Sequence, residues 1–300
     1  MTHPLFEGCT RPAEFYRRVI DVENLYSPLE MAEITADLST IPDPANRLLA
    51  ATARYMRMGA ERPRPYARIR LAERVHLYRA PGGAEPKSLL LCFSGNANRL
   101  MIPTAAFLQC VPEDRFDVAI VQDPTRFAYT RGIPGYADDL PSALKRLLDD
   151  LGARSHREIR CFGTSAGGAA ALYAGLLLSA KRAICVGGLH PTRNRLLRQE
   201  KERGRFTGLE WDALTAPRLA GRSTELVAVH AEGHQRDREG AQDLRAHLPG
   251  LRIASVRGSD KHAVIAELLM SNALQRFMGL FVLADTLPPA SRTQTGECDE

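Results

Sequence analysis

The chain has 300 residues, which is enough for one large domain or two small ones. Its hydrophobic content of 44% and charged content of 25% are typical of a globular protein with a sizeable core, and they argue against a largely disordered chain. The formal net charge of +5 is modest and spread along the sequence, and no zinc-finger, RNP or basic-region pattern occurs, so nucleic acid is not expected as a partner.

The cysteines and the N-terminal residues give no sign of export or of a membrane anchor. The six cysteines form no C-x-x-C or other metal-binding spacing, so neither a metal nor another cofactor is expected. Residues 1–15 lack a basic segment followed by an apolar one, and no apolar run is long enough to cross a bilayer. We therefore expect a reduced, cytoplasmic protein without a membrane span.

Residues 1–65 are predicted to form a helical appendage to the main domain. Segments 13–22 and 44–58 have helical periodicity, with proline, serine and threonine between them. The sequence RPRP at 62–65 cannot be helical throughout and marks the boundary. Because the segment is too short to bury a core alone, we expect it to cover one side of the main domain. A partner-binding module is the less favoured alternative.

From Tyr66 onward, strands alternate with helices. Segments 67–74 and 75–79 alternate in polarity, as in a half-exposed antiparallel edge. Short apolar runs typical of strands buried on both faces lie at 88–93, 117–121, 159–162, 182–186, 225–230 and 252–256. Helices are predicted at 104–111, 136–151, 166–179, 237–248 and 263–283. This alternation predicts an α/β fold with a mostly parallel, doubly wound sheet over residues 66–283.

Two segments fall outside this alternation. Residues 189–224 form the longest gap between predicted strands, and we expect them to form a small cap or lid that brings Trp211 to the substrate. The basic residues of this gap are predicted to form a solvated helix face. The alternative is a site for an anionic substrate group, because arginine binds carboxylate and phosphate bidentately. Residues 284–300 are expected to form a disordered tail.

The stretch 158–178 carries the strongest functional signal in the sequence. It comprises a short apolar strand, the tight turn GTSAG at 163–167 and an alanine-rich helix. A serine at the apex of such a turn has a strained backbone, and the residues two before and two after it must be small. Gly163, Ser165 and Gly167 meet this G-x-S-x-G requirement, so Ser165 is the predicted nucleophile. A small-residue turn in another kind of α/β sheet is the alternative.

An activated serine needs a base, and the base needs an orienting acid. Of the eight histidines, His262 is the one that lies just after the last predicted strand. A loop at that edge of the sheet can bring its imidazole over Ser165, so His262 is the predicted base. The alternative is a surface histidine that caps the last helix.

The GTSAG turn, the FSGNAN turn at 93–98 and the late His262 together resemble the α/β-hydrolase superfamily, over residues 66–283. The resemblance implies the chain order nucleophile, acid, base, with the acid after the strand 225–230. It also implies a serine esterase or thioesterase, or an acyltransferase.

The acid is where the sequence departs from the family. His234 occupies the position at which an aspartate is expected. Asp237 is the favoured acid, although its position also suits a helix cap, and Glu232 is the alternative. Asp260, or a Ser–His dyad without a strong acid, are the remaining options.

The resemblance implies an oxyanion hole as well. Its predicted donors are the backbone N–H groups of Asn96 and Ala166, and one such donor contributes on the order of 3 kcal/mol to transition-state stabilisation. Candidate substrate contacts lie in the loops at the same edge of the sheet: Asn96, Asn98, Arg126, Phe127, Tyr129 and Arg131. For the two asparagines the alternative is turn formation, and for the others it is packing against the cap.

The sequence therefore predicts a serine hydrolase that acts on a small-molecule ester or thioester through a covalent acyl-Ser165 intermediate. An acyltransferase with an alcohol or amine acceptor is one alternative. Another is a non-catalytic binding protein on the same scaffold, which the unusual segment HAEGHQRD at 230–237 suggests.

Overall fold

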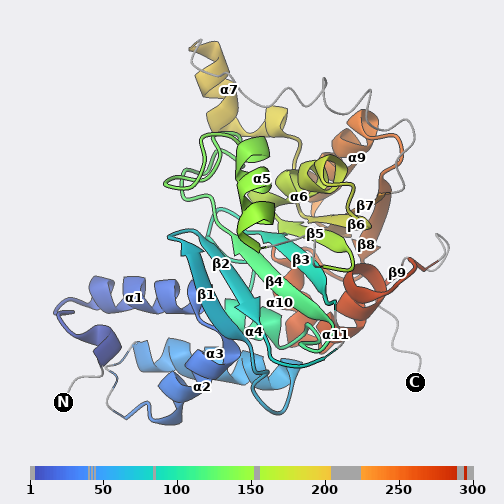
Figure 1. Ribbon diagram of the computed structural model, residues 1–300. Helices are drawn as coiled ribbons and strands as arrows, with labels where there is room; N and C mark the ends of the chain where they lie inside the picture. Colours follow the sequence, from blue (N-terminus) through green and yellow to red (C-terminus); the bar gives the residue numbers. More distant parts are fainter. Residues whose placement is uncertain are drawn as a thin grey trace.

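The computed structural model describes residues 4–39, 41, 43, 45–83, 86–151, 156–203, 224–288 and 294–295. Within these ranges nine strands form one sheet, in the order β1-β2-β4-β3-β5-β6-β7-β8-β9 (Figure 1). β1 (Ala67–Ala72) and β2 (Val75–Arg79) pair antiparallel at one edge, and β2 is also antiparallel to β4. The strands that run parallel to one another are β3 (Ser88–Phe93), β4 (Phe116–Val121), β5 (Ile159–Thr164), β6 (Arg182–Val186), β7 (Glu225–Ala231), β8 (Arg252–Val256) and β9 (Gln294–Thr295).

The central strands are apolar at successive positions because helices cover both faces of the sheet. In β3, Leu90 and Cys92 belong to one core, whereas Leu89, Leu91 and Phe93 belong to the other. Strands β3, β4 and β6 are buried at every residue. Continuous apolar runs are expected to be buried in this way.

Each face of the sheet has its own set of helices. The first core is formed with α1 (Pro12–Leu25), α2 (Pro28–Ala36), α3 (Ala45–Gly59), α4 (Thr104–Leu108), α10 (Val264–Met270), α11 (Leu274–Phe277) and the π-helix η4 (Met278–Leu283). The second core is formed with α5 (Leu140–Leu151), α6 (Ala166–Leu177) and α9 (Gln235–His247). The predicted α/β fold with a mostly parallel, doubly wound sheet is confirmed.

The N-terminal helices share a core with the sheet. Val19 of α1, Met31 of α2 and Leu49 of α3 are fully or almost fully buried in the same cluster as Leu90 of β3. The short 3-10 helix η1 (Pro4–Phe6) adds Phe6 to that cluster. The described residues between 4 and 59 therefore cover one face of the sheet with apolar side chains.

Two predicted helices depart from their expected limits for a reason that the structure shows. The helix predicted from residue 136 begins at Leu140, because the Asp139 carboxylate accepts the Ser142 N–H at 2.7 Å and so caps its first turn. The helix predicted over 263–283 is divided between α10 and α11 at Asn272, whose φ of 56° is left-handed. A left-handed residue ends a helix, since the next turn cannot continue in register.

The segment after β6 is described only in part. Its described portion contains the 3-10 helix η3 (Pro191–Arg193) and α7 (Arg195–Glu202), which stands at one end of the molecule (Figure 1). Trp211 and the rest of the predicted cap, residues 204–223, lie outside the described residues.

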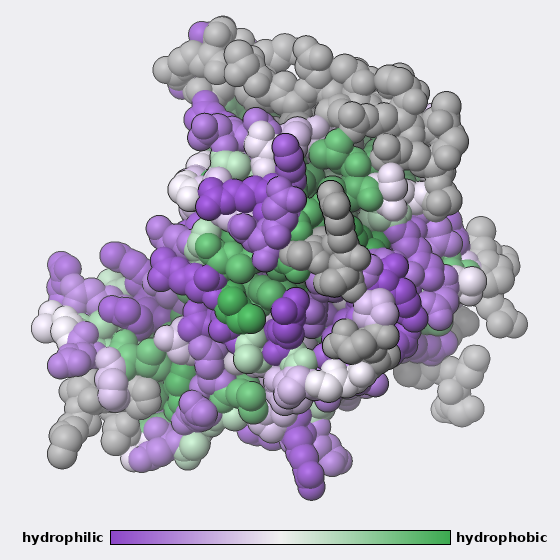
Figure 2. Space-filling model, in the orientation of Figure 1, coloured by the Kyte–Doolittle hydropathy of each residue, from purple (hydrophilic) through white to green (hydrophobic). Residues whose placement is uncertain are grey.

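The surface shown in Figure 2 is mostly hydrophilic, with smaller hydrophobic areas. The large hydrophobic side chains that are exposed in the described part of the chain are Tyr16, Leu29, Ile69, Leu196 and Met270. None of the helices in the described segments has the length and apolar character needed to span a bilayer.

The sheet order creates a crevice at the carboxyl ends of β3 and β5. These strands are neighbours, and the chain leaves them toward opposite faces, to α4 after β3 and to α6 after β5. Ligand sites of open α/β sheets form at such a switch point. Ser165 and the turn at 95–98 both lie there.

Candidate active site

Ser165 stands at the sharp turn between β5 and α6. Its backbone has φ 51° and ψ −119°, and its N–H donates to the Val186 carbonyl at 2.8 Å. A Cβ on Gly163 would lie 2.1 Å from the Gly167 carbonyl oxygen, and a Cβ on Gly167 would lie 2.3 Å from that of Phe93. The close approach of β3, β5 and α6 thus requires glycine at both positions, and it holds the strained serine in place.

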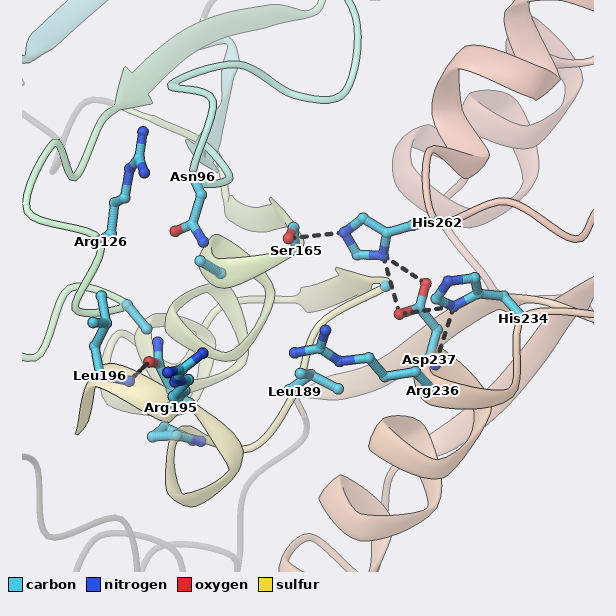
Figure 3. Close-up of a pocket in the computed structure, with 15 residues that line it drawn as sticks. Asn96, Arg126, Ser165, Leu189, Arg195, Leu196, His234, Arg236, Asp237 and His262 are labelled. Carbon is cyan, nitrogen blue, oxygen red and sulfur yellow. Dashed lines mark hydrogen bonds and ion pairs between the residues drawn. The ribbon is translucent and has the colours of Figure 1, made fainter. Parts of the chain in front are cut away.

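His262 brings its imidazole to Ser165 from the loop between β8 and α10. Its Nε2 is 2.9 Å from the Ser165 Oγ, and its Nδ1 is 2.8 and 3.0 Å from the two carboxylate oxygens of Asp237 (Figure 3). The Asp237 side chain is 1% exposed, whereas that of His262 is 44% exposed. The structure thus brings Ser165, His262 and Asp237 into one hydrogen-bonded chain, with the imidazole in the middle.

Asp237 is held by the first turn of α9, which follows β7. The residue that caps this helix is His234, whose Nδ1 accepts the Asp237 N–H at 3.3 Å and lies 3.2 Å from its Oδ1. Asp237 is the third helical residue, so the cap role considered for it belongs to His234. No role was predicted for His234, although its offset of three residues from Asp237 is that of a helix cap.

The other candidate acids point elsewhere. Glu232 is exposed, and its carboxylate accepts the N–H of Gly258 at 3.3 Å. Asp260 is exposed in the loop between β8 and α10, where it packs near Gly233. Among the described residues, the carboxylate that contacts His262 is that of Asp237.

The turn after β3 passes directly beside Ser165. A Cβ on Gly95 would lie 3.1 Å from the Ser165 Cβ, so a larger residue there would have to displace its neighbours slightly. The left-handed residue of this turn is Asn98, with φ 56°. Asn96 and Ala166 both line the space in front of Ser165. Ala166 is the first residue of α6, where an N–H has no acceptor within the helix.

A cavity of about 570 Å³ opens over Ser165. Its lining is mixed, with apolar residues Leu189, Pro191 and Leu196 and the charged residues Arg126, Arg195 and Arg236. Arg126 was predicted as a substrate contact, and the structure does place it on this lining.

Tyr129 was predicted to contact the substrate, and that prediction is wrong. The side chain is fully buried. Its ring lies edge-on to that of Phe93, with 5.3 Å between the ring centroids, and its hydroxyl donates to the Val121 carbonyl at 2.8 Å. Burial raises the pKa of this phenol, so it stays protonated and keeps that donor. Tyr129 therefore anchors the loop after β4 to the sheet.

Phe127, Arg131 and Asn98 are not among the described residues that line the cavity. The Arg131 guanidinium instead lies over the Phe127 ring, with its central carbon 3.8 Å from the ring centroid. The Asn98 carbonyl accepts the Gln122 side-chain amide at 2.8 Å, which ties the turn to β4. These three residues shape the loops around the cavity.

The buried Cys185 packs beside the helix that follows the serine turn. A Cβ on Gly168 would lie 2.5 Å from its sulfur, so the thiol is packed against α6. Burial raises the pKa of Cys185 to about 12, which keeps the thiol neutral. Ser165 therefore has no competing thiolate at this position.

Two clusters in the described part of the chain hold nitrogen and oxygen atoms close enough for a metal ion: His234–Asp237–His262 and His190–Asp243–His247. In the first cluster, the side chains already contact one another as described above. In the second, the rings of His190 and His247 stack with their centroids 3.9 Å apart and their planes at 12°.

The strand order and the serine turn define the class of fold. Antiparallel β2 lies beside β4, β3 lies between β4 and β5, and the serine stands between β5 and α6 on a G-x-S-x-G turn. This is the α/β-hydrolase fold that the sequence predicted.

Comparison with known proteins adds similar structures but no similar sequence. No family model matches the chain, and no curated protein matches it. The carboxylesterase CesB (YbfK) from Bacillus subtilis is 13% identical, with a TM-score of 0.48 over 78% of this chain and 96% of that one. A predicted CIB-like hydrolase from Thermoplasma acidophilum is 15% identical, with a TM-score of 0.45 over 71% and 94%.

Dienelactone hydrolase from Anabaena variabilis is 14% identical, with a TM-score of 0.44 over 71% of this chain and 95% of that one. Likenesses of this degree say nothing about the activity of the present chain.

Proposed function

We propose that the protein is a serine hydrolase that cleaves small carboxylic esters or thioesters through an acyl-Ser165 intermediate. The observation that supports this most is the chain of contacts from the Ser165 Oγ to the His262 Nε2 at 2.9 Å, and from the His262 Nδ1 to buried Asp237 at 2.8 Å. Nucleophile, base and orienting acid stand in hydrogen-bond reach in that order.

In the first half of the reaction, the Ser165 oxygen attacks the carbonyl carbon while His262 Nε2 takes the hydroxyl proton. Asp237 accepts from Nδ1–H and so keeps Nε2 free to act as the base. The N–H groups of Ala166 and Asn96 stabilise the oxyanion. The tetrahedral intermediate collapses, the carbon–oxygen or carbon–sulfur bond breaks, and His262 returns the proton to the leaving alcohol or thiol.

In the second half, water attacks the acyl-serine while His262 takes one of its protons; the bond to the Ser165 Oγ then breaks, His262 returns the proton to that oxygen, and the carboxylic acid leaves. The exposure of His262 favours water as the acceptor, because 44% of its side chain is open to solvent. Transfer to an alcohol or amine is the alternative, and it requires a drier site. The case for a non-catalytic binding protein depended on a missing acid, and Asp237 provides an acid in contact with the base.

We also retain a cytoplasmic location as part of this proposal. Among the described residues, Cys9, Cys92, Cys110, Cys161 and Cys185 are free thiols. Free thiols suit a reducing compartment.

A fluorophosphonate probe tests the proposal, because it reacts covalently with an activated serine. We expect labelling of the wild type, no labelling of Ser165→Ala and strongly reduced labelling of His262→Ala. Ser271→Ala is the matched control, since this exposed serine lies at the end of α10 and bonds to the Glu267 carbonyl. A folded wild type that stays unlabelled, or labelling that survives in Ser165→Ala, would contradict the proposal.

A further inference from the structure

Three arginine side chains border the cavity over Ser165, and each comes from a different element. Arg126 lies on the loop after β4, Arg195 begins α7, and Arg236 lies in the first turn of α9. Figure 3 shows Arg126 on one side of the space beside Ser165, with Arg195 and Arg236 on the other. All three are exposed.

The cavity provides no free negative charge to balance them. Its one described carboxylate is that of Asp237, which is 1% exposed and paired with His262. The ion pairs found in the described part of the chain engage none of these three arginines, whereas the nearby Arg193 pairs with Asp243 at 3.2 Å. An unbalanced group of like charges around a concavity creates a positive potential that attracts anions.

Helix stability does not account for two of these arginines. Arg195 is the first residue of α7, and Arg236 is the second residue of α9. The N-terminal turn of a helix carries partial positive charge, so a cation there is unfavourable. Their positions are instead suited to a ligand whose charge is negative.

Arg126 is held at the cavity by a strained but well-anchored loop. Arg126, Ala128 and Tyr129 have φ values of 63°, 51° and 63°, in the left-handed region that non-glycine residues rarely adopt. The buried Asp123 carboxylate fixes this conformation by accepting the N–H groups of Thr125 at 2.9 Å and Tyr129 at 2.8 Å. Strain of this kind persists where the surroundings hold it, and it is concentrated at functional sites.

We propose that Arg126, Arg195 and Arg236 bind an anionic group of the substrate, so that the preferred substrates are esters or thioesters bearing a carboxylate or phosphate away from the scissile bond. The inference rests on the proposed hydrolase function. Guanidinium groups bind both anions through paired N–H donors. Leu189 and Leu196, on the same lining, contact the aliphatic part between the anion and the reacting carbonyl.

Three esters that share a six-carbon acyl chain test the proposal on the full-length protein. They are mono-4-nitrophenyl adipate, 4-nitrophenyl 6-(phosphonooxy)hexanoate and the neutral methyl 4-nitrophenyl adipate. We expect kcat/KM for at least one anionic ester to exceed that of the neutral ester by tenfold or more, and the better anion identifies the group. Raising the salt concentration should reduce the preference, because salt screens exposed charges.

The variants Arg126→Gln, Arg195→Gln and Arg236→Gln should each lower the ratio of anionic to neutral kcat/KM at least threefold. Arg238→Gln is the matched control, because Arg238 is an exposed arginine on α9 that does not line the cavity. Equal turnover of all three esters would overturn the anion site and leave the hydrolase function standing. If no ester is cleaved and the probe leaves Ser165 unlabelled, the hydrolase function itself falls, and the anion site falls with it.

Discussion

Replacement of Asp237 by asparagine separates the orienting role of the acid from its shape. The carboxylate is 1% exposed and lies 2.8 and 3.0 Å from the His262 Nδ1, so both of its oxygens are available to accept Nδ1–H. An asparagine has the same shape but can turn its NH₂ group toward Nδ1. The imidazole would then carry its proton on Nε2, where it could no longer accept the proton of Ser165.

The expected loss in kcat is on the order of 10⁴-fold, as for a triad whose imidazole is held in the wrong tautomer. That loss corresponds to about 5 kcal/mol of transition-state stabilisation. The fold should survive, because the backbone N–H of Asp237 that bonds to His234 is unchanged. We therefore expect a melting temperature within a few degrees of the wild type.

Steady-state hydrolysis of 4-nitrophenyl acetate measures the effect, with Glu232→Gln as the matched control. Glu232 is an exposed carboxylate on the same loop, and it bonds to the Gly258 N–H, so its variant should keep kcat within about twofold. If a folded Asp237→Asn protein lost less than tenfold, or if Glu232→Gln lost as much, the assignment of the acid would be refuted.

Three further predictions concern stability, measured by chemical denaturation. Gly167→Ala should lower the free energy of unfolding by about 1–3 kcal/mol and abolish most of the activity, because its Cβ would lie 2.3 Å from a β3 carbonyl. In the control Gly279→Ala the new Cβ meets nothing within 4 Å, so the free energy of unfolding should change by no more than about 1 kcal/mol. Arg182→Met should lower the free energy of unfolding by about 3 kcal/mol, since the buried guanidinium donates at 3.0 Å to the carbonyls of residues 281 and 284. A loss below 1 kcal/mol would argue that these hydrogen bonds do not hold the C-terminal helices to the sheet. Burial lowers the pKa of His76 from 6.5 to about 4, so the unfolded chain binds the proton more tightly than the folded protein does. Up to about 3 kcal/mol of stability that is present above pH 6.5 is therefore lost as the pH falls toward 4. His76→Gln should flatten this pH dependence, and an unchanged slope would contradict the cause.

The serine turn could be predicted because its constraint is local. The glycines two positions before and after Ser165 are required by contacts of β3, β5 and α6, and any chain that builds this turn must meet them. His262 could be predicted from topology, since loops after parallel strands meet at one edge of the sheet.

The acid and the substrate contacts were harder to predict because they depend on side-chain direction. Asp237 and Glu232 are five residues apart, and which of them meets the base is decided by the start of α9 at Gln235 after its cap, His234. Tyr129 was predicted to contact the substrate because its loop follows a strand at the same edge of the sheet as Ser165. In the structure Tyr129 has a left-handed backbone, and its ring contacts Phe93 in the core instead of the cavity.

The most direct measurement is mass spectrometry of the protein quenched during turnover of 4-nitrophenyl acetate. The account predicts one acetyl group per chain on the peptide that contains Ser165, together with a burst of one 4-nitrophenolate per site. Neither should occur in Ser165→Ala. Steady turnover that persists in Ser165→Ala, with no acetylated peptide in the wild type, would contradict catalysis through this serine.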